Sequence, residues 1–157
     1  MNYNREKAVS YAREWALGRN PKFYNFDGIG GDCTNFVSQC LYAGSGVMNY
    51  TKDTGWYYIS AGNRAAAWAG VEFLHKFLTT NKKDGPFGVE LSIEYTQPGD
   101  IIQLSYDGHK FGHSLFVMDI HPIILVSHHS SENRLNRPFS DYLYHQARLI
   151  HIEGVNG

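Results

Sequence analysis

The spacing of apolar residues changes near residue 98, and this change constrains the fold more than any other feature of the sequence. Before it, apolar side chains recur at three- and four-residue steps, which is typical of helices. After it they alternate, which is typical of strands. The expected helices cover residues 5–17, 32–44 and 63–80, and the expected strands cover 100–105, 113–120, 123–129 and 147–153. Helices followed by strands predict an α+β fold with an antiparallel sheet.

Length and charge narrow the possible functions. A chain of 157 residues with 43% apolar side chains can build one core, so we expect residues 1–157 to form a single domain and a monomer. Lysine and arginine number 14 against 15 acidic residues, and no basic block stands out, which argues against nucleic-acid binding. Residues 1–7 contain no apolar run of the kind that an export signal needs, and no stretch approaches the ~20 apolar residues of a membrane span. Localisation stays open.

The chain has two cysteines, and only one of them lies where a nucleophile is expected. Cys33 and Cys40 are roughly 10 Å apart along one predicted helix, too far for a disulfide. Cys33 falls in the first turn, where unpaired N–H groups and the helix dipole favour thiolate and lower the pKa of a thiol. Cys40 lies on the apolar face. The pattern favours Cys33 as a nucleophile.

Histidines at two strand ends are the candidate partners of Cys33. His113 opens one predicted strand, and His128 and His129 close the next. Neighbouring antiparallel strands bring the end of one beside the start of the other. An imidazole base and a third group that orients its ring could therefore meet there. Alternation puts His128 and His129 on opposite faces but does not say which of them faces His113.

At these residues the chain resembles a known family. The run Gly31–Gln39 resembles the signature of the "putative amidase domain" of bacterial cell-wall-associated proteins, a member of the papain-like superfamily that includes the NlpC and CHAP peptidoglycan hydrolases. The segments Pro98–Gln103, Gly112–Ser114, His129–Glu132 and Asn136–Pro138 resemble its other blocks, in the same order. The resemblance implies a papain-like fold with a catalytic cysteine at a helix N-terminus.

The resemblance also implies a mechanism. Cys33 would be the nucleophile, His113 the base and His129 the residue that orients its ring. The substrate would be an amide bond in peptidoglycan peptides, outside the membrane, and no metal or organic cofactor would be needed. An ion pair of Cys33 thiolate and His113 would give a bell-shaped pH profile. The last block departs from the family's His-Thr-x-Asp, reading His129-Ser130-Ser131-Glu132, and adds His128.

Several further residues are candidates for the oxyanion or for substrate. The backbone N–H of Cys33 is the natural first oxyanion donor, and Tyr24 is a candidate because superfamily relatives often place a tyrosine upstream of the cysteine. Asp32 is expected to cap the helix and Asn35 to bond to nearby backbone, although both could also face substrate. His128 and Trp56 complete this set.

Two other readings of the sequence stay open. The four histidines His109, His113, His128 and His129 could form a zinc site, although no metal-binding spacing supports one. A non-catalytic wall-binding module is the second alternative, with aromatic side chains that stack on sugars. Those side chains would be Tyr50, Trp56, Tyr57 and Tyr58.

Overall fold

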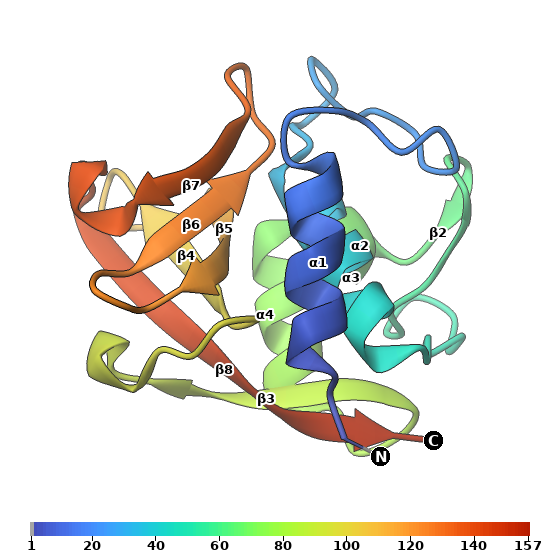
Figure 1. Cartoon of the computed structure of the whole chain (residues 1–157). Helices are drawn as coiled ribbons and strands as arrows, with labels where there is room; N and C mark the ends of the chain where they lie inside the picture. Colours follow the sequence, from blue (N-terminus) through green and yellow to red (C-terminus); the bar gives the residue numbers. More distant parts are fainter. Residues whose placement is uncertain (1) are drawn as a thin grey trace.

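A computed structural model describes residues 2–157 of the chain. The helices are α1 (Arg5–Trp15), α2 (Cys33–Ser45), α3 (Ala66–Ala69) and α4 (Val71–Thr80), with short 3-10 turns at Ile93–Tyr95 and Phe139–Asp141. The strands are β1 (Tyr58–Ser60), β2 (Asn63–Arg64), β3 (Gly85–Leu91), β4 (Ile101–Ser105), β5 (His113–Asp119), β6 (Leu125–His128), β7 (Arg134–Pro138) and β8 (Gln146–Asn156). Figure 1 shows the helices packed beside one twisted sheet. The predicted α+β class is confirmed.

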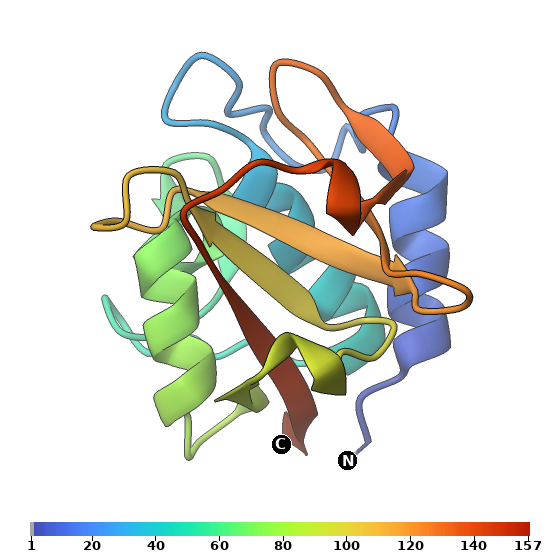
Figure 2. The same cartoon turned by 90° about the vertical axis from the view of Figure 1, so that its left-hand side faces the viewer.

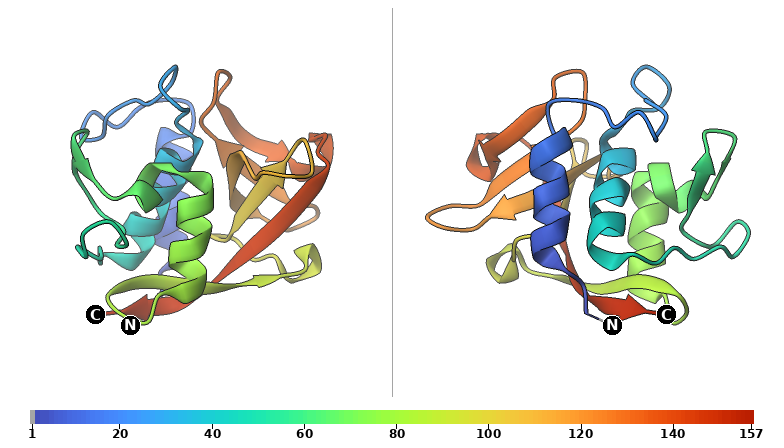
Figure 3. Two further views of the ribbon diagram at one scale, coloured as in Figure 1. Left: turned by 180° about the vertical axis from the view of Figure 1, so that it is seen from behind. Right: turned by 45° about the vertical axis from the view of Figure 1, so that its right-hand side comes forward.

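The first helix begins where the sequence predicts. The side chain of Asn4 accepts a hydrogen bond from the backbone N–H of Lys7, which satisfies one of the free donors of the first turn. The small residues Ala8 and Ala12 are fully buried and allow α1 to lie close to α2. Figure 3 shows α2 between α1 and α4, so the helix that carries Cys33 is enclosed by its neighbours.

The second helix ends at Ser45, one residue later than predicted, and its C-cap is Gly46 rather than Gly44. Gly46 adopts the left-handed conformation (φ 69°) of a C-cap, whereas Gly44 stays inside the helix. A Cβ on Gly44 would lie 2.6 Å from the Tyr3 ring and 2.8 Å from the carbonyl oxygen of Asn4. Gly44 therefore allows the chain that enters α1 to approach α2, rather than ending the helix.

The predicted helix over 63–80 is confirmed as two helices, α3 and α4, but it is wrong at its start and at Gly70. Asn63–Arg64 is a short strand paired with β1, and Gly70 is extended (φ −113°, ψ 128°) between α3 and α4. The helical spacing of apolar residues continues across Gly70 because α3 and α4 both bury their apolar side chains in the same core. Trp68 on α3 and Leu74 on α4 are both fully buried in the main core.

All the pairings in the main sheet are antiparallel, and its strand order is β3-β8-β4-β5-β6-β7. Ile101 and Phe116 face the helices and join the main core. Leu104, Leu115 and Val126 face the other side and form a smaller cluster. Figure 2 shows β4, β5 and β8 crossing in front of the helices, with both termini at the same end of the molecule.

Four strands were predicted in the second half of the chain, and all four are confirmed within a few residues. Two further strands of the main sheet, β3 and β7, are at its edges and were not predicted. The sequence does not predict β3 because it contains Gly85, Pro86 and Gly88, which are unusual in strands. It does not predict β7 because that strand contains Pro138 and Asn136, whose φ is positive (55°). Within residues 2–157, no helix combines the length and the apolar character that crossing a membrane requires.

Candidate active site

Cys33 is the first residue of α2 and lies in a hollow of about 360 Å³. The thiol residue is 9% exposed, whereas Cys40 is fully buried in the core, and both thiols are free as predicted. The floor and rim include the Gly30–Gly31 turn, Gly112 and His113. The start of α2 and the start of β5 therefore border one cavity, and this places the predicted nucleophile and base at the same site.

A chain of hydrogen bonds leads from the sheet to the sulfur of Cys33. The amide of Gln103 donates to the Ser114 hydroxyl (3.2 Å), which is 3.0 Å from the Thr34 hydroxyl. The Thr34 hydroxyl in turn lies 3.8 Å from Sγ of Cys33. The amide nitrogen of Gln103 can only donate, so the Ser114 hydroxyl can donate its own hydrogen to the Thr34 hydroxyl. The Thr34 hydroxyl can in turn donate a hydrogen bond to the sulfur of Cys33. This chain joins β4, β5 and α2 behind the thiol.

Burial dominates the electrostatics of the two candidate catalytic groups. Burial raises the pKa of the Cys33 thiol, although backbone N–H groups of Ser114 and Thr34 and the Thr34 hydroxyl act in the opposite direction. Burial also lowers the pKa of His113 to about 4. The expected lowering of the Cys33 pKa at the helix start is therefore not observed. In this state the pair is a neutral thiol and a neutral imidazole rather than an ion pair.

His128 is the histidine that contacts His113. The two ring centroids are 4.7 Å apart, and the rings are nearly perpendicular (84°). His128 is 4% exposed, and neither of its ring nitrogens makes a well-aligned hydrogen bond among the described residues, although the backbone of His129 is close enough to act on its pKa. Burial, with smaller effects of the nearby His113 and Arg137, lowers the pKa of His128 to about 3, so the ring is neutral.

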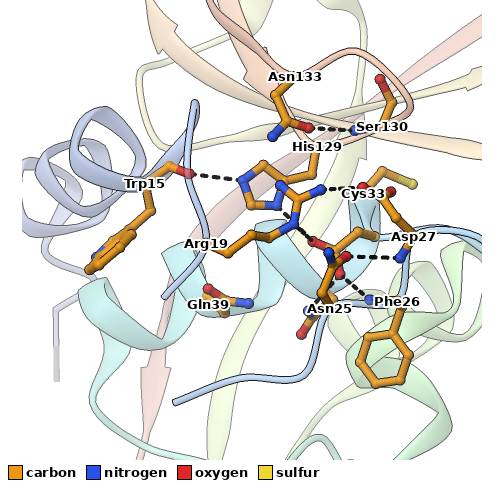
Figure 4. Close-up of polar contacts among 12 residues, drawn as sticks. Trp15, Arg19, Asn25, Phe26, Asp27, Cys33, Gln39, His129, Ser130 and Asn133 are labelled. Atoms are coloured by element: carbon orange, nitrogen blue, oxygen red, sulfur yellow. Dashed lines mark hydrogen bonds and ion pairs between the residues drawn. The ribbon is translucent and has the colours of Figure 1, made fainter. Parts of the chain in front are cut away.

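The side chain of His129 points to the opposite side from His128, and both of its ring nitrogens are hydrogen-bonded there. Its Nδ1 is 2.7 Å from a carboxylate oxygen of Asp32, and its Nε2 is 2.8 Å from the backbone carbonyl oxygen of Trp15. Its ring stacks on Phe36, with centroids 4.1 Å apart. Figure 4 shows His129 reaching across to Trp15. This differs from the expectation that His129 orients His113.

The hydrogen bonds of His129 also define its chemical state. A carbonyl oxygen and an ionised carboxylate can only accept, so both ring nitrogens donate. Burial acts to raise the pKa of Asp32, but bonds from His129, the Phe26 N–H and Asn35 outweigh it, and the pKa of Asp32 is lowered. His129 is therefore bonded as an imidazolium paired with Asp32, which suits a structural ion and not a partner for the base.

Asp32 does not cap α2 as predicted, although it occupies the N-cap position. Its side chain makes no capping bond and instead accepts from the backbone N–H of Phe26 (2.8 Å) and from Asn35 (2.9 Å). The guanidinium Nε of Arg19 lies 3.6 Å from the same carboxylate. Asp32 thus ties the segment around Phe26, the loop after α1 and the residue after β6 to the helix that carries Cys33.

The other predicted substrate-facing residues are occupied elsewhere. Asn35 donates to the carbonyl oxygen of Tyr24 (2.9 Å) and accepts from the indole of Trp68 (2.8 Å), so its amide serves packing. The Tyr24 ring lies against Phe26, at a centroid distance of 4.9 Å, and does not line the Cys33 hollow. Trp56 is fully buried and donates to Ser38, which removes it as a sugar-stacking residue.

The four histidines of the zinc alternative do not come together. His109 lies in an exposed loop, and the ring of His129 is bonded to Asp32 and Trp15. Among residues 2–157, no group of three or more histidine, cysteine and acidic side chains is placed to hold a metal ion.

A second hollow, of about 550 Å³, adjoins the first and was not predicted. The two share Gly112, His113, Ser130 and Ser131. The second hollow is lined further by Tyr106, His128, Glu132, Arg134, Arg137, Asp141, Tyr142 and Leu143. Its histidines and the blocks that contain Ser130 and Arg137 have sequence signals, whereas Tyr106 and Tyr142 come from a loop and from the turn after β7 and have none.

A thiol at a helix start and a histidine at a strand start thus border one hollow on an antiparallel α+β fold. The chain belongs to the "putative amidase domain" family, which it matches over residues 2–152. The family name indicates hydrolase chemistry.

One curated relative can be compared directly. The chain is 33% identical over 122 residues to a protein of Bacillus subtilis (strain 168) named "Uncharacterized protein YhbB". The match covers 75% of this chain but 38% of the relative, so the chain spans well under half of that protein. No solved structure matches the chain.

Proposed function

We propose that the protein is a cysteine amidase or peptidase that cleaves an amide bond in peptidoglycan peptides, on a papain-like fold of the NlpC and CHAP kind formed by residues 1–157 as one domain. The observation that carries this proposal is the single hollow shared by Cys33, at the start of α2, and His113, at the start of β5. The family supports amide hydrolysis, and the resemblance to wall-associated proteins supports the substrate.

The proposed reaction starts from the neutral pair. His113 accepts the thiol proton as the sulfur of Cys33 attacks the carbonyl carbon of the amide. The backbone N–H of Cys33 faces the developing oxyanion at the free end of the helix. The imidazolium then gives its proton to the leaving amine, which departs and leaves a thioester on Cys33. Water, deprotonated by neutral His113, hydrolyses the thioester and restores the thiol and the acid product.

In this mechanism His128, not His129, orients the base. Its ring contacts His113 and is neutral, whereas the ring of His129 is held as an imidazolium by Asp32. A neutral ring can accept from the N–H of His113 and so favour the tautomer that takes the proton of Cys33. His129 is a positioning residue, because it holds Asp32 and thereby the start of α2.

An extended substrate fits the surface around the nucleophile. The Cys33 hollow adjoins the hollow of Arg137 on one side, and on the other it shares Gly30 and Gly31 with a hollow of about 670 Å³. The hollow that holds the thiol thus shares lining residues with two further cavities. A peptide chain that runs through all three would present an internal amide to the sulfur, which suits cleavage within a stem or a cross-bridge.

The test is digestion of purified peptidoglycan, with new amino and carboxyl ends measured by mass spectrometry of the released fragments. Wild-type protein should release such ends, and Cys33→Ala should abolish the release. Cys40→Ala is the matched control, because it removes the other thiol of the same helix. Turnover by Cys33→Ala equal to that of wild type would refute the proposal.

A further inference from the structure

We propose that the hollow beside the nucleophile, bounded by Tyr106, His128, Arg137 and Tyr142, binds a carboxylate carried by the substrate next to the amide that is cleaved. This inference deepens the proposed amidase function and rests on it. It names the chemical class of substrate, a peptide acid, that the site would prefer to the corresponding carboxamide.

The first observation is a group of buried polar atoms that lack well-aligned partners. Both ring nitrogens of His128 and the hydroxyl of Tyr142 are buried without a well-aligned hydrogen bond among residues 2–157, and only the backbone of His129 and the side chain of Arg137 lie close enough to act on their pKa values through hydrogen bonding. Such atoms are rare in folded proteins, because leaving one unsatisfied costs about 1–3 kcal/mol. Both residues line the same hollow, and their rings lie 5.6 Å apart. A bound acceptor there would satisfy donors that the protein itself leaves free.

The second observation is the charge of the same wall. The guanidinium of Arg137 stacks over the Tyr142 ring at 4.4 Å, and its closest acidic group, Asp141, lies 3.9 Å away and is largely exposed. Arg134, by contrast, is already paired with Glu132. Arg137 is thus held beside Tyr142, and its acidic partner Asp141 lies near the distance limit of an ion pair. Arginine binds carboxylates through parallel hydrogen bonds.

The donors around Arg137 suit a carboxylate at neutral pH. Burial raises the pKa of Tyr142 to about 12, so its hydroxyl remains a donor. A neutral His128 has one N–H to offer and one nitrogen left for His113. Tyr106 lines the same hollow as His113, which also borders the hollow of Cys33. A carboxylate on Arg137 would therefore lie one hollow away from the sulfur, as the neighbour of the reacting amide.

The location also gives the carboxylate a part in the reaction. His113 becomes positive when it takes the thiol proton, and the carboxylate would lie on the His128 side of that charge. An anion held in a fixed position stabilises a positive charge that develops nearby. The bound carboxylate should therefore favour turnover as well as binding.

The test uses one peptidoglycan stem peptide in two forms, with its carboxylates free and with the same carboxylates converted to carboxamides. For wild-type protein, kcat/KM should be about tenfold to a hundredfold higher for the acid form. Arg137→Gln should remove this difference, whereas Arg13→Gln, which removes an exposed charge on α1, should keep it. Equal rates for the two forms, or equal losses for both forms in Arg137→Gln, would overturn the inference.

A binding measurement separates this inference from the proposed reaction. Cys33→Ala protein is titrated with both forms of the peptide, and the acid form should bind at least about tenfold more tightly in an Arg137-dependent way. Acid-selective binding without cleavage by wild type would refute the hydrolase and leave the carboxylate site standing. Cleavage of both forms at equal rates would refute the carboxylate site and leave the proposed hydrolase standing. Arg137→Lys, which keeps the charge, should retain part of the preference and decides the question if Arg137→Gln does not fold.

Discussion

Replacing Asp32 by asparagine tests whether the ion network under α2 holds the active site together. The substitution keeps the shape of the side chain but removes the negative charge that faces His129 at 2.7 Å and Arg19 at 3.6 Å. Both Asp32 and His129 are about 1% exposed, so the remaining imidazolium would be buried without its counter-ion. Breaking a buried pair in this way costs about 3–5 kcal/mol. For a chain of this length that corresponds to a fall in Tm of about 6–20 °C.

The assay is urea unfolding at pH 7 of wild type, Asp32→Asn and a matched control. Asp27→Asn removes the other carboxylate that pairs with Arg19, but this one is at the half-buried edge and should cost about 0–1 kcal/mol. His129→Gln in the Asp32→Asn background should cost little, because the ion it removes has already lost its partner. An Asp32→Asn cost no larger than that of Asp27→Asn would refute the reasoning.

The pH dependence of stability follows from the same carboxylate. The pKa of Asp32 is lowered in the folded state, so its contribution is complete above the unfolded value of about 3.9 and is lost as the pH falls below it. The difference in unfolding free energy between wild type and Asp32→Asn should therefore shrink below about pH 4. A constant difference from pH 7 to pH 3 would mean that folding does not lower the pKa of Asp32.

Three further outcomes follow from the structure. Because the pKa of His113 is about 4, kcat/KM should fall tenfold per pH unit only below that value, and an acid limb near pH 6.5 would contradict the buried neutral base. Gly44→Ala should lower the unfolding free energy by about 1–3 kcal/mol through the clash at 2.6 Å, whereas Gly62→Ala, with open space around it, should not. Ser114→Ala breaks the chain of hydroxyl groups that leads to Cys33, so the rate of alkylation against pH should show a higher pKa of the thiol. Turnover should fall about fivefold, the equivalent of about 1 kcal/mol. An unchanged alkylation profile would show that the hydroxyl chain does not act on the sulfur.

Part of the site could be predicted because it depends on local structure. A cysteine in the first turn of a helix and a histidine at the first position of a strand are visible in the spacing of apolar residues, and the two segments meet as expected. The pKa of Cys33 could not be predicted from that spacing. It depends on how much of the thiol the Gly30–Gly31 turn and β5 cover, which is a tertiary property.

The choice between His128 and His129 shows the same limit. Strand alternation predicts that the two rings lie on opposite faces, and they do. Only the partners decide their roles, and these come from distant segments: Asp32 and the Trp15 carbonyl for one ring, His113 for the other. The edge strand β7, which carries Arg137, could not be predicted for a related reason. Its residues show neither an apolar run nor a regular alternation of buried and exposed positions.

The covalent intermediate is the most direct test of the central claim. Protein is mixed with peptidoglycan fragments, quenched in acid during turnover and weighed by mass spectrometry. The account predicts a species heavier by the acyl product less one water, present in wild type and Cys40→Ala and absent in Cys33→Ala. Cleavage that proceeds in Cys33→Ala, or an adduct that requires Cys40 instead, would contradict it.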